Sequence, residues 1–195
     1  MSTAEATSDW KLPSQRKVGM ISLIITESAL FTIFVVAYLF YMGKSLNGPY
    51  PYQVLHLPIW ASFALFGSSV TIWFAEKALH KGSKIGFNIW WLITILMGAY
   101  FVYFTAEEWY HLIYKEGLTI STNVFGSTFY ALVGLHVSHV IVGLVLLTIV
   151  FVSSLRGKLH HDHHEHVEMV SWYWHFVDAI WVVVLLVVYI ISLNY

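Results

Sequence analysis

A histidine and a carboxylate stand three residues apart near the end of the chain, in the segment Trp172-Tyr-Trp-His-Phe-Val-Asp-Ala-Ile-Trp181. Residues at this spacing share one face of a helix, so His175 and Asp178 are expected to lie side by side. Ionisable groups inside a membrane helix are costly and usually functional or paired. The aromatic residues of the same turn are typical of a helix that enters the headgroup region. We therefore predict that His175 and Asp178 form a pair, within the helix or between helices, that locks a membrane bundle.

Three further ionisable side chains lie inside apolar runs. Glu27 lies about nine residues into the first run, or roughly 13 Å from its start at the helical rise. By the same measure Asp178 lies about 9 Å from the same side, and His139 and His136 lie about 20 and 24 Å from it. This spacing predicts a ladder of polar groups that leads from one membrane surface toward the midplane.

Glu27 has no basic residue near it in its own span. Its carboxyl group is therefore protonated, paired across helices or hydrated. Burial disfavours the charged form of a carboxyl group, and a neutral carboxyl group at this place can carry or gate a proton. A role in proton movement and a merely tolerated neutral side chain are both open. For His136 and His139 the sequence favours hydrogen bonds between helices, with haem or metal ligation as the alternative.

The composition indicates a membrane protein. Hydrophobic residues make up 58% of the chain and charged residues 11%, against about 45–50% and about 25% in soluble domains. The absence of cysteine excludes disulfides, thiolate metal sites and iron–sulfur clusters. A formal net charge of −1 gives no reason to expect a nucleic-acid partner.

Five apolar runs are long enough to cross a bilayer as helices, which takes about 20 residues each. The runs cover about 18–42, 57–74, 86–104, 125–152 and 172–193. We predict an all-α fold in which residues 18–195 form one bundle of five transmembrane helices, preceded by a polar segment at 1–17 that lacks the features of a signal peptide. Ser83 and the cluster that ends at Asn123 provide capping oxygens for the third and fourth helices. Glycines at 43 and 157 suit the residue that follows a helix end.

The basic residues are distributed unequally between the two ends of these helices. One side carries eight lysines and arginines, whereas the other carries only Lys44 and Lys115. Because basic residues concentrate on the cytoplasmic side, the N-terminus is predicted to be cytoplasmic and the C-terminus to lie outside.

A run of histidines and carboxylates, His160-His-Asp-His-His-Glu-His166, falls in the loop before the last span. Such a set can bind zinc or nickel weakly, but a solvated, pH-sensitive loop is the favoured interpretation. A metal-binding membrane transporter is one alternative function. A carrier with two haems on His136, His139 and His175 is another, although the depths of these histidines do not match in pairs.

Several segments together resemble subunit III of cytochrome c oxidase, in the right order and over nearly the whole chain. The last helix resembles the family at Trp172–Trp181, with His163, His164 and Glu168 upstream. The fourth span resembles it from Phe125-Gly-Ser-Thr-Phe-Tyr130 into Gly134-Leu-His-Val-Ser-His-Val-Ile-Val-Gly143. The first span, Gly19-Met-Ile-Ser-Leu-Ile-Ile-Thr-Glu27, resembles the helix whose membrane glutamate reacts with carbodiimides, and Glu108 fits a glutamate of an outer loop.

The resemblance implies a non-catalytic subunit of a proton-pumping haem–copper oxidase in a bacterial cytoplasmic membrane. Such a subunit binds no haem or copper. It packs against subunit I, which carries the redox centres, within a complex that also contains subunit II. Its implied roles are to sustain proton uptake, protect turnover and hold structural phospholipids. The residues expected to serve in proton movement or as buried polar groups are Glu27, His136, His139, His175 and Asp178. The residues expected to contact lipid or another subunit are Glu108, His163, His164, Glu168, Trp172 and Trp174.

One departure from the family pattern is the number of helices. The long form has seven helices, of which the first two form a lipid-filled cleft against the other five, whereas this sequence begins where the third would be. It therefore resembles the short five-helix form. Subunit III of a quinol oxidase of the same superfamily is the alternative, and Tyr173-Trp174 before His175 favours the cytochrome c type.

Overall fold

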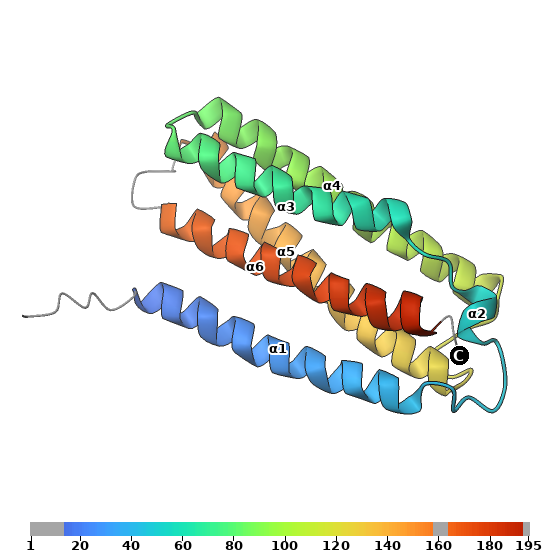
Figure 1. The fold of residues 1–195 in the computed structure, drawn as a ribbon. Coiled ribbons are helices and arrows are strands. Elements are labelled where there is room, and N and C mark those ends of the chain that lie inside the picture. The colour runs from blue at the N-terminus through green and yellow to red at the C-terminus, as the bar shows by residue number, and fades with distance from the viewer. Residues whose placement is uncertain (1–13, 158–163, 193–195) are drawn as a thin grey trace, which may run out of the picture.

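The computed structural model describes residues 14–157 and 164–192, which form helices and no strand. Five helices in this part are long and apolar enough to cross a membrane, as the sequence predicted. They are α1 (Gln15–Tyr41), α3 (Ile59–His80), α4 (Lys84–Tyr114), α5 (Val124–Leu155) and α6 (His164–Val184) (Figure 1). A single turn, α2 (Pro51–Val54), lies between α1 and α3, and α6 continues into a π-helical segment, η2 (Leu185–Ile191). The predicted all-α fold with five membrane spans is confirmed.

The helices run further than the apolar stretches from which they were predicted. Helix α4 continues past residue 104 to Tyr114, and α6 begins at His164 rather than near residue 172. The reason is that polar and aromatic residues at helix ends extend the helix into the headgroup region without adding to the apolar run. Asp178 therefore lies about 21 Å from the start of α6 and Glu27 about 18 Å from the start of α1, at about 1.5 Å per residue, deeper than the sequence indicated.

Helix ends are stabilised where the sequence predicted. The Ser83 hydroxyl accepts a hydrogen bond from the Gly86 amide at 3.3 Å, and the Asn123 side chain accepts one from the Gly126 amide at 2.8 Å. These bonds satisfy amides that have no partner inside the helix. After α1 and α5 the chain turns through Gly43 and Gly157, with φ of 71° and 68°.

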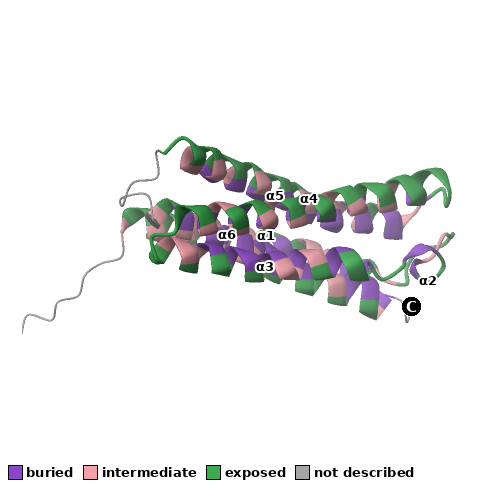
Figure 2. Ribbon diagram, turned by 90° about the horizontal axis from the view of Figure 1, so that it is seen from above, coloured by how far each residue is buried: buried purple, intermediate pink, exposed green. Residues whose placement is uncertain are grey.

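Helix α6 is the centre of the bundle. It contacts α3, α5 and α1, while α4 packs against α3 and α5 on the opposite side from α1 (Figure 1). Burial is densest along α6 and sparsest along α1 (Figure 2). We call the end at which α1, α4 and α6 begin the near end, and the opposite end the far end.

Trp174 on α6 is a fully buried core side chain that packs closely against glycines of two neighbouring helices. A Cβ atom at Gly98 of α4 would lie 2.7 Å from its ring, and one at Gly143 of α5 would lie 2.8 Å from it. Its indole N–H donates to the Ser68 hydroxyl of α3 at 2.8 Å. The two glycines thus provide the space for one indole between three helices, which sets the separation of α4, α5 and α6.

Candidate functional site

A carboxylate and an imidazole meet across α1 and α5, inside the membrane-spanning part of the bundle. Glu27 Oε2 lies 3.0 Å from His139 Nε2. The side chains of Glu27 and His139 are 25% and 15% exposed, so the contact is open on one side. We call this contact the Glu27–His139 bridge.

The contact of the other ring nitrogen of His139, Nδ1, limits the protonation states that the bridge can adopt. His139 Nδ1 lies 2.8 Å from the backbone oxygen of Leu135, and because a carbonyl oxygen only accepts, Nδ1 carries a proton. Nε2 then either accepts the proton of a neutral Glu27 or donates its own to an ionised Glu27. One proton between the two groups therefore satisfies both, and it can move from one group to the other without a change of partner.

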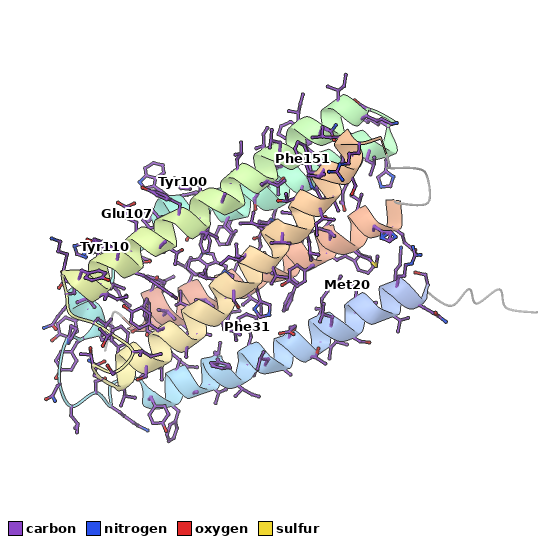
Figure 3. The ribbon with its side chains drawn as sticks, turned by 180° about the vertical axis from the view of Figure 1, so that it is seen from behind. Met20, Phe31, Tyr100, Glu107, Tyr110 and Phe151 are labelled. Carbon is purple, nitrogen blue, oxygen red and sulfur yellow. The ribbon has the colours of Figure 1, made fainter. Side chains whose placement is uncertain are left out.

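The bridge is fixed in place by its neighbours. Phe31, one turn after Glu27, places its ring centroid 5.0 Å from that of His139 and lies between α1 and α5 (Figure 3). Tyr173 of α6 donates its hydroxyl to the His139 backbone oxygen at 3.3 Å. Three helices thus hold the imidazole at one position.

Of the three states that the sequence left open for Glu27, the structure contains the one in which the carboxyl group pairs across helices. The sequence did not identify the partner, because no local pattern shows which residues of α1 and α5 meet. Helix α1 begins at Gln15 and α5 ends at Leu155, so these residues lie about 18 and about 24 Å from the near end. The two depths differ by about 6 Å, nearly as much as do the depths of about 13 and 20 Å estimated from the sequence, so depth alone gave only a weak signal for the pair.

A second polar contact connects α3 and α6 through a hydroxyl group. Ser69 donates to Asp178 Oδ2, and its oxygen lies 3.0 Å from His175 Nδ1. With an ionised Asp178, the order of donation is from His175 to Ser69 and from Ser69 to Asp178. We call this contact the Ser69–His175–Asp178 bridge.

In this bridge the predicted pairing of His175 with Asp178 runs through a third residue. The two residues share a face of α6 as predicted, but the hydroxyl of Ser69 on α3 lies between their polar atoms. Asp178 is buried, and its Oδ1 has no hydrogen-bond partner among the described residues. The role of Ser69 was missed, because a serine in an apolar run usually bonds to its own helix.

The expected hydrogen bonds of His136 are absent from the part of the chain that the structure describes. The side chain is fully buried, and neither ring nitrogen has a partner there. Its ring stacks on Trp181 at 5.0 Å and meets the edge of Phe101 at 5.8 Å. His136 thus packs as an aromatic residue of the core. The other two histidines of the two-haem alternative, His139 and His175, bond to Glu27 and Ser69.

The candidates at the near end form contacts between α1 and α6. Glu168 forms an ion pair with Lys17 at 2.9 Å, and the same ammonium group lies 5.5 Å from the ring of Trp172. His163 lies outside the described residues, as does most of the histidine-rich loop, and of His164 only its place at the start of α6 is described. Contact of Glu168 and Trp172 with lipid or another subunit stays a prediction.

Of the candidates expected to contact lipid or another subunit, Trp174 faces the interior of the chain instead, whereas Glu108 is half-buried and its outside contact stays a prediction. Trp174 is fully buried, since the glycines of α4 and α5 leave room for it. Glu108 accepts hydrogen bonds from the hydroxyl of Tyr189 at 3.1 and 3.2 Å. The preceding residue, Glu107, is exposed on the outer side of α4.

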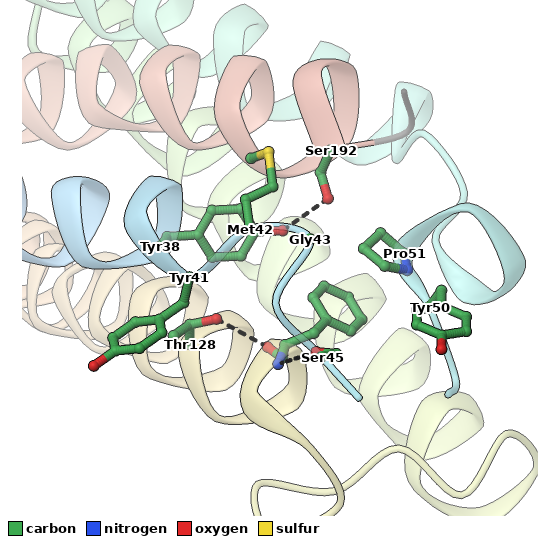
Figure 4. A pocket seen from close by; sticks show the side chains of 10 residues that line it. Tyr38, Tyr41, Met42, Gly43, Ser45, Tyr50, Pro51, Thr128 and Ser192 are labelled. Atoms are coloured by element: carbon green, nitrogen blue, oxygen red, sulfur yellow. Dashed lines mark hydrogen bonds between the residues drawn. The ribbon is translucent and has the colours of Figure 1, made fainter. Parts of the chain in front are cut away.

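At the far end, the last turn of α1 is joined to the residue that follows η2, and the loop after α1 is joined to the start of α5. Tyr38 and Ser192 share a hydrogen bond of 3.0 Å, beside a small pocket (Figure 4). Asn123 donates to the backbone oxygens of Asn47 and Pro49 at 3.0 Å each. These contacts hold α1, which has little other burial, against α5 and thereby support the Glu27–His139 bridge.

The described residues contain no group of three or more histidine, aspartate or glutamate side chains placed to hold a metal ion. Cysteine is absent from the whole sequence.

Comparisons with known proteins cover nearly the whole chain. The family model described as cytochrome c oxidase subunit III matches residues 7–193. The chain is 34% identical over 184 residues to cytochrome c oxidase subunit 3 of Loxodonta africana, in an alignment that covers 89% of this chain and 68% of that relative. The corresponding proteins of Ovis aries and Lemur catta are each 33% identical over 184 residues, covering 89% of this chain and 68% and 65% of the relatives. All the described helices fall within the matched residues.

Proposed function

The chain belongs to the cytochrome c oxidase subunit III family, and on that premise we propose that it supports proton uptake by the catalytic subunit and stabilises it without carrying a redox centre. As a subunit III it is one part of a multi-subunit terminal oxidase that lies in a membrane. The match to this family favours this assignment over subunit III of a quinol oxidase.

The observation that carries the proposal is the 3.0 Å contact between Glu27 and His139. A carboxyl group and an imidazole that share one proton keep their hydrogen bond when a second proton arrives, because Nε2–H then donates to the neutral carboxyl group, so the pair can take up a proton and pass it on without losing this bond. The partial exposure of both side chains places this exchange at the edge of the chain, where a neighbouring subunit can take part. Proton uptake is thereby supported by α1 and α5, while α3 and α6 supply rigidity.

The direction of proton uptake follows from the orientation of the bundle. Arg16, Lys17, Lys77, Lys81, Lys84 and Arg156 all belong to the near end by the order of the helices. Because basic residues favour the cytoplasmic side, we place the near end in the cytoplasm and the C-terminus outside. The bridge then lies about 18 Å from the cytoplasmic end along α1. A bacterial cytoplasmic membrane is the location that the resemblance to the short five-helix form implies.

Subunit I is the expected direct partner, with subunit II in the same complex. In this proposal the haem and copper of the oxidase lie in the catalytic subunit, and this chain binds none. Structural phospholipids are expected at the near end, where Lys17 and Trp172 offer a cationic and an aromatic group to the headgroup region.

The test starts with purification of the chain from its native membrane in mild detergent, followed by a reduced-minus-oxidised spectrum and identification of the accompanying subunits by mass. A haem–copper subunit in stoichiometric amount is expected. Proton uptake on the cytoplasmic side is then followed with a pH-sensitive dye during turnover of the complex, for the wild type and Glu27→Gln. We expect slower uptake in the variant at unchanged subunit composition. A chain that purifies with its own haem, or equal uptake in both complexes, would refute the proposal.

A further inference from the structure

One exposed stripe runs the length of α4, and its two halves differ in chemistry. The half toward the near end is aliphatic, with Ile85, Ile89, Leu92 and Leu96 exposed. The half toward the far end carries Tyr100, Tyr103, Glu107, Tyr110 and Tyr114, which are all exposed as well. Three of these, Tyr100, Glu107 and Tyr110, are seen on the outer side of α4 (Figure 3). The residues recur at spacings of three and four, which places them on one face of the helix. We call the second half the tyrosine stripe.

The general enrichment of aromatic residues at membrane surfaces explains only part of the tyrosine stripe. Tyr110 and Tyr114 lie in the last turns of α4, where such a belt is expected. Tyr100 lies near the middle of the helix, about 21 Å from Tyr114 at about 1.5 Å per residue. Helical side chains also lean toward the N-terminus of their helix, which directs the Tyr100 hydroxyl away from the far end. Its side chain is too short to reach water from there.

The hydroxyls in the middle of the stripe lack partners in the described chain. Tyr100 and Tyr103 are 45% and 66% exposed, and neither makes a hydrogen bond to another described residue. A tyrosine hydroxyl cannot fold back onto the carbonyl groups of its own helix turn. A donor left unbonded in hydrocarbon is costly.

The exposed face of α1 shows how a lipid-facing helix avoids this cost. Its exposed serine and threonine hydroxyls belong to Ser22, Thr26 and Thr32. They donate to backbone oxygens of their own helix at 2.9, 2.8 and 2.8 Å. These side chains therefore present only satisfied groups to lipid, whereas the tyrosine stripe presents unsatisfied ones.

Glu107 adds a charge to the stripe. It lies two turns before the end of α4 and makes no ion pair with the described residues, although it borders a pocket that His56 and His111 also line. The neighbouring Glu108 has its hydrogen bonds from Tyr189. The carboxylate is complementary to a basic side chain, and the unbonded hydroxyls on the same helix face are complementary to hydrogen-bond acceptors.

We propose that the tyrosine stripe is the docking surface for a transmembrane helix of another subunit of the oxidase, one that presents hydrogen-bond acceptors to Tyr100 and Tyr103 and a lysine or arginine to Glu107. The inference rests on the assignment of the chain to a multi-subunit oxidase. Polar side chains on a membrane helix associate with a partner that satisfies them, and the stripe supplies both the donors and the charge for such a contact.

The test uses photo-cross-linking in the intact complex. A photoreactive benzoylphenylalanine replaces Tyr103, and the matched control replaces Ile89, which lies on the same face in the aliphatic half. Irradiation in native membranes is expected to join the Tyr103 position to another oxidase subunit, identified by mass, with much less product from the Ile89 position. An adduct with a second copy of this chain, an adduct with lipid alone, or equal products from both positions would overturn the inference.

The charge is tested by combining the Tyr103 probe with Glu107→Lys. The yield of the cross-link is expected to fall by roughly tenfold, since a like charge then faces the basic group of the partner. An unchanged yield would overturn the assignment of a lysine or arginine to Glu107. The two levels of failure are distinct: a complex that contains the catalytic subunit but gives no cross-link refutes only the docking surface, whereas a chain that purifies without any oxidase subunit refutes the proposed function.

Discussion

The Glu27–His139 bridge and the Ser69–His175–Asp178 bridge contain the same two chemical groups in different surroundings. The first joins α1 to α5 at the edge of the bundle and stays partly open. The second joins α3 to α6, where Asp178 is buried and Trp174 packs nearby against two glycines. A pair at an open edge can exchange a proton with a neighbour, whereas an enclosed one mainly fixes the helices that enclose it. The following predictions separate these two roles.

The largest expected effect is that of Asp178→Ala. The variant leaves the Ser69 hydroxyl and the His175 ring without their shared acceptor in a buried place, so the free energy of unfolding should fall by about 3 kcal/mol. Thermal denaturation of the purified chain in mild detergent measures this effect. The amount of chain retained in the oxidase complex should fall as well, and by more than in Glu27→Gln. Equal yields of intact complex from the two variants would contradict the structural role of Asp178.

The packing around α6 is tested by Gly143→Ala. The added methyl group would lie 2.8 Å from the Trp174 ring, so the α5–α6 contact must open and the free energy of unfolding should fall by about 2 kcal/mol. The matched control is Gly19→Ala on α1, where a Cβ atom meets nothing within 4 Å. A loss of stability in the control as large as that in Gly143→Ala would show that α1 is as tightly packed as α6.

A smaller effect is expected for Ser69→Ala. The variant removes the hydroxyl between His175 and Asp178 but keeps both groups, so the loss in unfolding free energy should be about 1 kcal/mol. Ser22→Ala is the control, because Ser22 bonds only to its own helix, and it should change stability by less than about 0.5 kcal/mol. If both variants melt alike, Ser69 does not connect α3 with α6.

The smallest effect on stability is expected for Glu27→Gln. Glutamine keeps the shape of the side chain and a hydrogen bond to His139, and the site is partly open, so unfolding should change by less than about 0.5 kcal/mol. The same variant should lower the number of turnovers that the oxidase completes before it inactivates, because the exchangeable proton on Glu27 is lost. A drop in stability without any change in turnover would reverse the roles assigned to the two bridges.

The sequence predicted the helices better than it predicted their contacts. Five spans, the caps at Ser83 and Asn123 and the turn at Gly43 follow from local patterns, and the structure confirms them. The Glu27–His139 contact depends on how α1 lies against α5, which no local pattern encodes.

The two errors at α6 have the same physical origin. Trp174 was expected at the membrane surface because it stands in an aromatic turn, yet glycines on α4 and α5 create the space that buries it. The role of Ser69 was missed because its partners are on another helix. Complementary residues distant in sequence decide burial and pairing, and a single sequence does not show which of them meet.

In the proposed function, Glu27 and His139 act as one unit in proton uptake. The most direct test is a double-mutant cycle in the intact oxidase with Glu27→Gln, His139→Gln and both together, in which the rate of proton uptake and the number of turnovers before inactivation are measured. Each single variant is expected to impair both quantities, and the double variant is expected to be no worse than the single ones, because residues that act as a unit are not additive. Unimpaired uptake in the single variants, or losses that simply add, would contradict this shared role of Glu27 and His139.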